Sequence, residues 1–144
     1  MSATLMKAAV LGDGGLEFRN LPVPQPGPEE VLVRVHAVAL NRADLGMLAG
    51  HKHGSAGGPG TVLGMEFAGQ VAAIGAAVSH VKPGDRVMCS GRGAFAEYAL
   101  ADLGRVAALP SAQTSFAQGA CLPVALQTMH DAVVTHGALR PGQT

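Results

Sequence analysis

Few side chains in this 144-residue sequence combine a suitable type and spacing for chemistry. His51 and His53 alternate within the segment Gly50-His-Lys-His-Gly54, a pattern that can indicate a metal site. Zinc in proteins is held by three or four side chains, however, and no further ligand follows nearby. We therefore expect both histidines to be solvated and to bind no metal.

The cysteines offer no clear nucleophile. Cys89 and Cys121 are far apart in the sequence, show no Cys-x-x-Cys spacing and have no histidine or basic cluster beside them. The N-terminus lacks the features of a signal peptide, so a disulfide is not expected either. We expect reduced thiols, with Cys89 in a core strand and Cys121 packed under a helix.

Asn41 and Asp44 have the spacing of a helix start. An Asn at the N-cap with an acidic residue three positions later is typical of a capping box. Glu66 can be a charge at a strand end that pairs with an arginine. Thr128 can be a helical threonine whose hydroxyl bonds back to a carbonyl in the preceding turn.

Short strands separated by glycine and proline must position these side chains. The pattern predicts them at Met6–Leu11, Leu16–Leu21, Val31–Val38, Phe67–Ile74, Arg86–Cys89, Ala94–Ala101 and Arg105–Leu109. Gly12-Asp-Gly-Gly15, between the first two, is expected to form a hairpin turn. This many short strands favours an antiparallel barrel or sandwich over alternating β and α units.

The pattern becomes helical after Ser115. Apolar residues recur at helical spacing at positions 122, 126, 129 and 133. Pro123 suits the first turn of a helix, and Gly137 suits the position after its last turn. Val124 and Thr128 lie four residues apart on another face of this helix.

Six segments, taken in order, resemble the N-terminal GroES-like domain of the medium-chain dehydrogenase/reductase superfamily, in its zinc-independent quinone oxidoreductase-like branch. They are Val33-Arg-Val35, Ala39-Leu-Asn-Arg-Ala-Asp44, Leu63-Gly-Met-Glu-Phe-Ala-Gly69, Val81 to Val87, Gly93-Ala-Phe-Ala-Glu-Tyr98 and Pro123-Val-Ala-Leu-Gln-Thr128. Each segment alone is a weak signal, but six in the right order cover nearly the whole chain.

The resemblance implies a mainly β fold, a GroES-like, partly open β-barrel with short helices. Residues 1–121 would form the catalytic, substrate-side domain. Residues 122–144 would be a linking helix that leads toward a Rossmann coenzyme-binding domain absent from this sequence. We therefore expect a longer parent protein and little or no activity from these 144 residues alone.

The resemblance also bears on metal chemistry. Zinc-containing members of the superfamily hold the metal through a Cys, a His and a second Cys, and these places fall at Asn41, Met65 and Val124 here. A thioether is a poor zinc ligand beside imidazole, carboxylate or thiolate. The cluster of four cysteines that holds a structural zinc is missing as well, so no zinc is expected.

The implied activity is NADPH-dependent hydride transfer to a quinone or an activated alkene such as an enone. These substrates delocalise the incoming charge, so hydrogen bonds can replace a Lewis acid. Two alternatives remain open. One is an enoyl-thioester or polyketide reductase of the same superfamily, and the other is a stand-alone, non-enzymatic interaction module.

The resemblance assigns roles to the candidate residues. Asn41 would lie near the nicotinamide or the substrate carbonyl, Asp44 would hold the cleft loop, and Glu66 would lie under the active site. Thr128 would contact the nicotinamide from the linking helix. The predicted catalytic residues are thus Asn41, Asp44 and Glu66, and the predicted cofactor contacts are Asn41 and Thr128.

Composition excludes several other classes of function. Ten basic residues balance ten acidic ones without runs of either sign, so no nucleic-acid or membrane partner is expected. No apolar run approaches the roughly 20 residues that span a bilayer. We expect a cytoplasmic protein and a possible homodimer, since members of this superfamily often dimerise, commonly through the coenzyme-binding domain.

Overall fold

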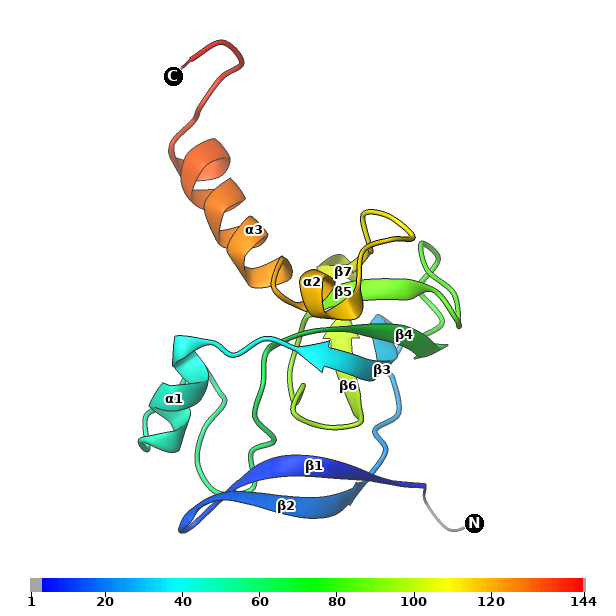
Figure 1. Cartoon of the computed structure of the whole chain (residues 1–144), viewed down its shortest axis with the longest axis vertical. Helices are drawn as coiled ribbons and strands as arrows, with labels where there is room; N and C mark the ends of the chain where they lie inside the picture. Colours follow the sequence, from blue (N-terminus) through cyan, green and yellow to red (C-terminus); the bar gives the residue numbers. More distant parts are fainter. Residues whose placement is uncertain (1–3, 144) are drawn as a thin grey trace.

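The computed structural model describes residues 4–143, in which a curled antiparallel sheet, a separate β-hairpin and short helices are assembled (Figure 1). The strands are β1 (Leu5–Gly12), β2 (Gly15–Pro22), β3 (Glu30–Val38), β4 (Glu66–Ile74), β5 (Arg86–Ser90), β6 (Tyr98–Asp102) and β7 (Val106–Ala108). The helices are α1 (Arg42–Leu48), the 3-10 turn η1 (Leu103–Arg105), α2 (Phe116–Ala120), α3 (Pro123–His130) and the π-helix η2 (Asp131–His136). The predicted mainly β fold with short helices is confirmed.

The main sheet has five strands in the order β6-β3-β4-β5-β7. Its inner face forms the core, where Val31 and Val33 of β3 pack with Phe67, Val87 and Cys89, all fully buried. Phe67 is the largest fully buried side chain. Because the sequence has so few aromatic residues, the core is built mostly from valine and alanine.

The curl of the sheet depends on a bulged pairing between β3 and β4. Their register shifts twice, once between Leu32 and Val33 and again between Val35 and Ala37. Beside the second shift, Gly69 approaches the β3 backbone so closely that a Cβ there would lie 2.0 Å from the Arg34 carbonyl oxygen. A glycine in a strand commonly marks such a close approach, and bulges bend the strand.

The hairpin of β1 and β2 turns at Gly12-Asp-Gly-Gly15, as predicted, with an unbroken register along both strands. On its other edge, β1 is held by irregular backbone. The Ala9 N–H donates to the Phe95 carbonyl at 2.7 Å, and the Leu11 N–H donates to the Thr61 carbonyl at 2.8 Å.

The prediction of a strand over Ala94–Ala101 is wrong in its first half. A regular strand begins only at Tyr98. The segment before it is drawn toward β1 by the Ala9–Phe95 bond and by a bond from the Glu97 N–H to the Lys7 carbonyl at 3.1 Å. Because the backbone groups of residues 95 and 97 bond to β1, this segment does not continue the pairing of β6 with β3.

The C-terminal helical region is divided rather than continuous. Ser115 caps the short helix α2, and its partner is Gln118: the Gln118 N–H donates to Ser115 Oγ at 3.2 Å, and the Ser115 N–H donates to Gln118 Oε1 at 2.9 Å. This Ser-x-x-Gln capping box was present in the sequence. The break follows at residues 121–122, before Pro123 starts α3.

Arg86 fastens α2 and the loop before it to the sheet. Its guanidinium donates to the carbonyls of Ala112 and Thr114 at 2.7 and 2.6 Å. The same group lies over the Phe116 ring at 4.7 Å, and that ring stacks against His36 of β3 with centroids 4.4 Å apart. These contacts place the start of α3 beside β4 and β5.

Helix α3 projects away from the barrel (Figure 1). The predicted apolar stripe along α3 and η2 is not covered in the described residues, since Leu126, Met129 and Val133 are all exposed. No helix within residues 4–143 is long and apolar enough to cross a membrane.

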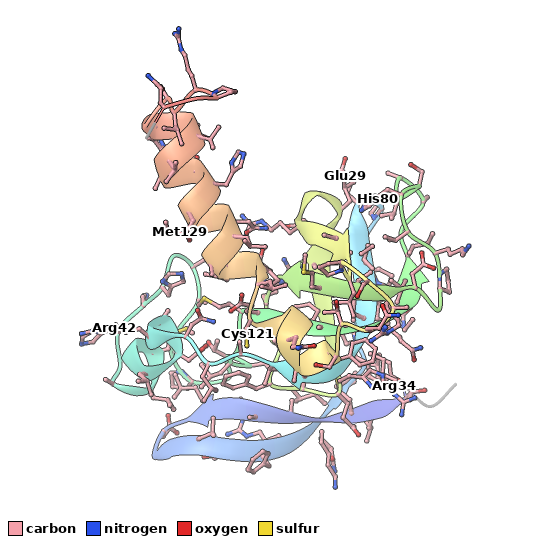
Figure 2. All side chains as sticks on the ribbon, turned by 45° about the horizontal axis from the view of Figure 1, so that its top comes forward. Glu29, Arg34, Arg42, His80, Cys121 and Met129 are labelled. Carbon is pink, nitrogen blue, oxygen red and sulfur yellow. The ribbon has the colours of Figure 1, made fainter. Side chains whose placement is uncertain are left out.

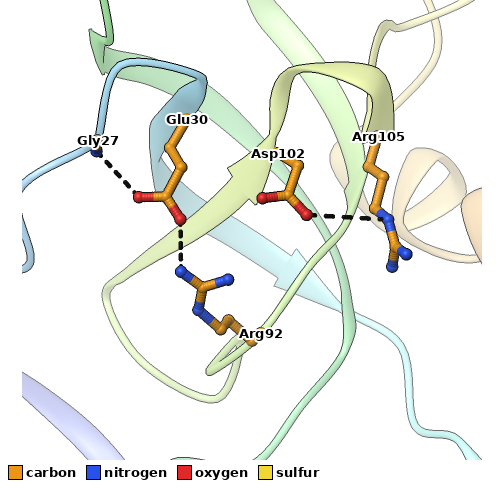
Figure 3. Close-up of polar contacts among 5 residues, drawn as sticks. All are labelled: Gly27, Glu30, Arg92, Asp102 and Arg105. Atoms are coloured by element: carbon orange, nitrogen blue, oxygen red, sulfur yellow. Dashed lines mark hydrogen bonds and ion pairs between the residues drawn. The ribbon is translucent and has the colours of Figure 1, made fainter.

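The Glu30 carboxylate, at the start of β3, links the loop at Gly27 to the segment that carries Arg92 (Figure 3). It accepts the Gly27 N–H at 2.9 Å and pairs with Arg92. The Gly27 bond and, after it, the Arg92 guanidinium lower the pKa of Glu30 despite the opposing effect of desolvation. This contribution to stability is present above the ordinary carboxyl pKa and is lost as the pH falls through the lowered value. The neighbouring Asp102–Arg105 pair is exposed, at 4.0 Å.

Gly69→Ala tests the close approach of β3 and β4. We expect it to destabilise the protein by about 2–4 kcal/mol, because the new methyl group meets backbone that cannot move without breaking the sheet. Urea unfolding followed by circular dichroism measures the change. Gly104→Ala is the matched control, since a Cβ there meets nothing within 4 Å and the backbone is not left-handed. Equal stability of the two variants would contradict this account of the curl.

Candidate functional site

A pocket of about 430 Å³ lies where the connection from β3 to α1, the start of β4 and the first turns of α3 meet. It is lined by Ala39, Leu40, Asn41, Glu66, Cys121, Val124, Ala125, Thr128 and Met129. Three of the four residues predicted from the sequence, Asn41, Glu66 and Thr128, are therefore brought together from distant parts of the chain. The fourth, Asp44, lies behind them.

Asn41 is both a helix cap and a pocket residue. It is the N-cap of α1, with extended backbone, and its N–H donates to Asp44 Oδ2 at 2.8 Å in a capping box. Its side-chain nitrogen, Nδ2, donates to Glu66 Oε2 at 3.2 Å. The predicted helix start is confirmed, and the amide is also turned toward the pocket.

Asp44 ties α1 to the segment that leads into β4. Its side chain is buried, and its second oxygen accepts the Gly64 N–H at 3.2 Å. Gly64 has φ 93°, a left-handed conformation that favours glycine. Asp44 thus fixes the position of Asn41 without facing the pocket itself.

Glu66 is the central polar group of the site. Only 4% of the residue is exposed, and both carboxylate oxygens are used: Oε2 accepts from Asn41, and Oε1 accepts the Val124 N–H at 2.7 Å. Val124 is the second residue of α3, and the first N–H groups of a helix have no partner within the helix. A carboxylate at this end is also favoured by the helix dipole. The alternative of an arginine partner for Glu66 is not found in residues 4–143.

Helix α3 carries Thr128 over the pocket. A second contact holds the helix, because Ser90 Oγ at the end of β5 donates to Gln127 Oε1 at 3.0 Å. Thr128 is exposed and follows Val124 by about one helical turn. Figure 2 shows Cys121 at the foot of α3 and Met129 farther along the same helix.

The two thiols lie in contrasting environments. Cys89 is buried in the core as predicted, and burial raises its pKa to about 12. The prediction that Cys121 packs under the helix is wrong: the residue is exposed and lines the pocket. Cys121 lies at the C-terminus of α2, and its thiol donates to the Ala117 carbonyl at 3.4 Å. The chain breaks between α2 and α3 at this point, which leaves the side chain on the outside of both helices.

Sequence reasoning also missed the apolar wall of the pocket. Leu40 and Met129 line it, and both are exposed. Leu40 directly precedes Asn41, and Met129 directly follows Thr128. Their positions beside two candidate residues were a usable signal, although helical spacing had suggested that Met129 belonged to a packed stripe.

The three residues at the places that the resemblance assigned to zinc ligands are not zinc donors. At the three places that correspond to zinc ligands, Asn41 supplies an amide that already donates to Glu66, Met65 supplies a thioether, and Val124 supplies an N–H. Zinc requires imidazole, thiolate or carboxylate donors. In the described part of the chain, no group of three or more His, Cys, Asp or Glu could hold a metal ion. His51 and His53 are exposed, as expected.

Comparison with known proteins relates most of the chain to one family. The model of the alcohol dehydrogenase GroES-like domain matches residues 27–121. Sorbitol dehydrogenase of Gallus gallus is 42% identical over 93 residues, which is 60% of this chain and 25% of that protein. The pikromycin polyketide synthase component PikAII of Streptomyces venezuelae is 38% identical over 121 residues, 83% of this chain and 3% of that protein.

Solved structures share the fold over nearly the full chain. The quinone oxidoreductase of Coxiella burnetii matches with a TM-score of 0.80 and 26% identity, over 96% of this chain and 47% of its own. A mycobacterial protein complexed with NADPH matches with a TM-score of 0.79 and 27% identity, over 95% of this chain and 43% of its own. The chain thus spans about a quarter of the sorbitol dehydrogenase and just under half of these structures.

Glu66→Gln tests the central role of the carboxylate. We expect a loss of about 1–3 kcal/mol, because an amide has one acceptor oxygen where two donors must be satisfied. Denaturant unfolding measures the loss, and amide hydrogen exchange at Val124 should become faster. Glu29→Gln makes the same chemical change at an exposed side chain and should be nearly neutral. Unchanged stability and unchanged exchange at Val124 would show that the network is not needed.

The thiols should react very differently. At pH 8 we expect Ellman's reagent to modify Cys121 in the native protein and to leave Cys89 untouched, since Cys89 is buried and its raised pKa keeps it neutral. Unfolding in denaturant should expose Cys89, so that the reagent then modifies both thiols. Cys121→Ser should abolish the native reaction, whereas rapid modification of Cys89 in that variant would contradict the buried placement.

Proposed function

Because this chain belongs to the alcohol dehydrogenase GroES-like domain family, we propose that it is the substrate-side domain of an NADPH-dependent oxidoreductase that reduces a quinone or an activated alkene without zinc. The observation that carries the proposal is the engagement of Glu66. Both of its oxygens bind N–H donors, from Asn41 and from the start of α3. The pocket is thereby organised by hydrogen bonds at the place where zinc enzymes of the superfamily would need metal ligands.

The pocket offers neutral donors to a substrate oxygen. Nδ2 of Asn41 carries two protons, and Glu66 accepts one of them. The other proton and the exposed Thr128 hydroxyl are available to a carbonyl or quinone oxygen. Because the oxyanion of a reduced quinone or enone is weakly basic, such donors can stabilise it without a metal.

Apolar residues form the rest of the pocket. Leu40, Ala125 and Met129 provide an apolar surface for a planar, largely apolar substrate. Glu66 and Asp44 act behind this surface as positioning residues. Asp44 orients the Asn41 backbone, and Glu66 orients the Asn41 side chain relative to α3.

We propose that a nicotinamide cofactor binds at this pocket and supplies the hydride when bound. Thr128 and Asn41 are the residues of this chain that would face the nicotinamide. We propose that the rest of the dinucleotide is held by a further domain of a longer protein, through a glycine-rich turn at a helix N-terminus. The similarity to a mycobacterial protein complexed with NADPH supports the choice of cofactor.

An enoyl-thioester reductase is the second candidate. The similarity to a polyketide synthase component extends over 83% of this chain, more than the 60% covered by the sorbitol dehydrogenase of Gallus gallus. An enoyl thioester is also an activated alkene, so the same donors would serve it. The two candidates therefore differ in substrate and share one mechanism.

Kinetic assays of the protein made from the native gene test the proposal. We expect it to oxidise NADPH with quinones or 2-enoyl thioesters, and chelators such as 1,10-phenanthroline should leave the rate unchanged. Asn41→Ser should lower kcat/KM by about 10- to 100-fold, since it removes the amide donor. Serine keeps the N-cap, but loss of the Nδ2 donor to the buried Glu66 carboxylate should cost about 1–3 kcal/mol of stability, so the kinetics are compared where both proteins remain folded.

Asn20→Ser provides the matched control, being the same substitution at an exposed position of β2. It should leave the kinetics unaltered. Oxidation of sorbitol that depends on bound zinc would contradict the proposal, as would an Asn41→Ser enzyme with full activity. Turnover of thioesters alone would select the second candidate.

A further inference from the structure

The edge of β2 that faces away from β1 has no partner strand in the described part of the chain. Within residues 4–143, β2 pairs only with β1, through a register that runs without a bulge from Leu5 opposite Pro22 to Gly12 opposite Gly15. The hairpin lies at the end of the molecule opposite α3 (Figure 1). Because open edges present unpaired N–H and C=O groups, they are ready templates for pairing with another strand.

The backbone groups on this edge can be identified from β1. Ala9 and Leu11 use their N–H groups on the far side of β1, toward Phe95 and Thr61. The alternate residues of β1 therefore bond to β2, and their partners in β2 include Glu17 and Arg19. It follows that the N–H and C=O groups of Leu16, Phe18 and Asn20 point outward.

The edge lacks two of the features that protect open strands, a proline and a bulge. No proline or bulge interrupts it between Gly15 and Leu21. Phe18 is 82% exposed and Leu16 is 46% exposed. Both also line an apolar groove of about 610 Å³ that lies between the hairpin and β3. A partner strand would continue this apolar surface.

Two charges of opposite sign flank Phe18 and make the edge self-complementary. Glu17 and Arg19 lie on one face of β2, where they form an exposed ion pair at 2.7 Å. In an antiparallel pairing of two β2 strands, residues directly opposite each other interact most strongly. The register of such a pair thus decides which charges meet.

We propose that β2 is a self-association edge, which pairs antiparallel with β2 of a second copy of this chain in a register centred on Phe18. Outward-facing residues must oppose outward-facing residues, so the two-fold axis must pass through a residue of β2, and the three central choices are Glu17, Phe18 and Arg19. A centre at Glu17 places two carboxylates opposite each other, and a centre at Arg19 places two guanidinium groups opposite each other. Only the centre at Phe18 sets each Glu17 opposite an Arg19.

This register also satisfies the backbone. Phe18 of each copy exchanges hydrogen bonds with its equivalent, and Leu16 of one copy exchanges them with Asn20 of the other. The contact is isologous, as two-fold dimers require, so it closes and does not propagate. One strand pair buries less area than the roughly 1,200–2,000 Å² of stable interfaces, so the dimer forms reversibly with concentration.

Charge variants of the full chain test the register directly. Sedimentation velocity across a concentration series should show a wild-type dimer. Glu17→Arg and Arg19→Glu should each weaken self-association by at least about tenfold, because like charges then face each other. An equimolar mixture of these two variants should associate, since arginines of one chain meet glutamates of the other. The double exchange Glu17→Arg with Arg19→Glu should restore the homodimer.

Hydrogen exchange and a control variant complete the test. In the dimer, exchange should slow at the N–H groups of Leu16, Phe18 and Asn20 and stay unchanged at Glu17 and Arg19, which bond to β1. Glu29→Arg alters net charge as Glu17→Arg does but lies at an exposed site outside the hairpin, and it should dimerise normally. A wild-type chain that is monomeric at its highest soluble concentration would overturn the proposal. So would failure of the mixed variants to associate, or equal weakening by Glu29→Arg.

Discussion

The buried carboxylate of Glu66 is the constraint on which the site depends. A carboxylate removed from water must have its oxygens bonded, or its burial costs several kcal/mol. Here one oxygen holds the Asn41 amide, and the other holds the first free N–H of α3. A single side chain on β4 therefore fixes the connection before α1 and the start of the projecting helix relative to each other. In the described residues, no buried side-chain nitrogen or oxygen lacks a partner.

The barrel places Glu66 where it can make these bonds. Antiparallel pairing places the end of β3 beside the start of β4 at one rim of the sheet, with Val38 opposite Phe67, and Gly69 permits the sheet to curl there. Arg86 fastens the loop before α2, which delivers α3 to the same rim. The pocket is thus a product of sheet curvature and of two polar anchors, with apolar residues from three elements filling the space between them.

The two ends of the molecule offer different surfaces. At one end, α3 carries exposed apolar residues and the pocket. At the other, the hairpin presents an open strand edge with an aromatic residue between two opposite charges. Pairing at the hairpin would leave the pocket accessible, because the hairpin lies away from α3. Leu40 lines both the groove beside the hairpin and the pocket, so substitutions at Glu17 and Arg19 vary self-association without touching a pocket residue.

Local patterns in the sequence determined the mainly β class, the turn at Gly12–Gly15, the helix start at Asn41 and the helix start at Pro123. Each follows from backbone preferences or from alternation over a few residues, so the identities of neighbouring residues are enough to predict it. Only the tertiary structure decided that the segment 94–97 hydrogen-bonds to β1, that Cys121 lines the pocket and that Glu66 accepts hydrogen bonds from Asn41 and Val124. These outcomes depend on contacts between residues distant in the chain, up to 90 positions apart for Lys7 and Glu97. Such a contact depends on how the sheet curls, and the spacing of neighbouring residues in the sequence does not predict the curl.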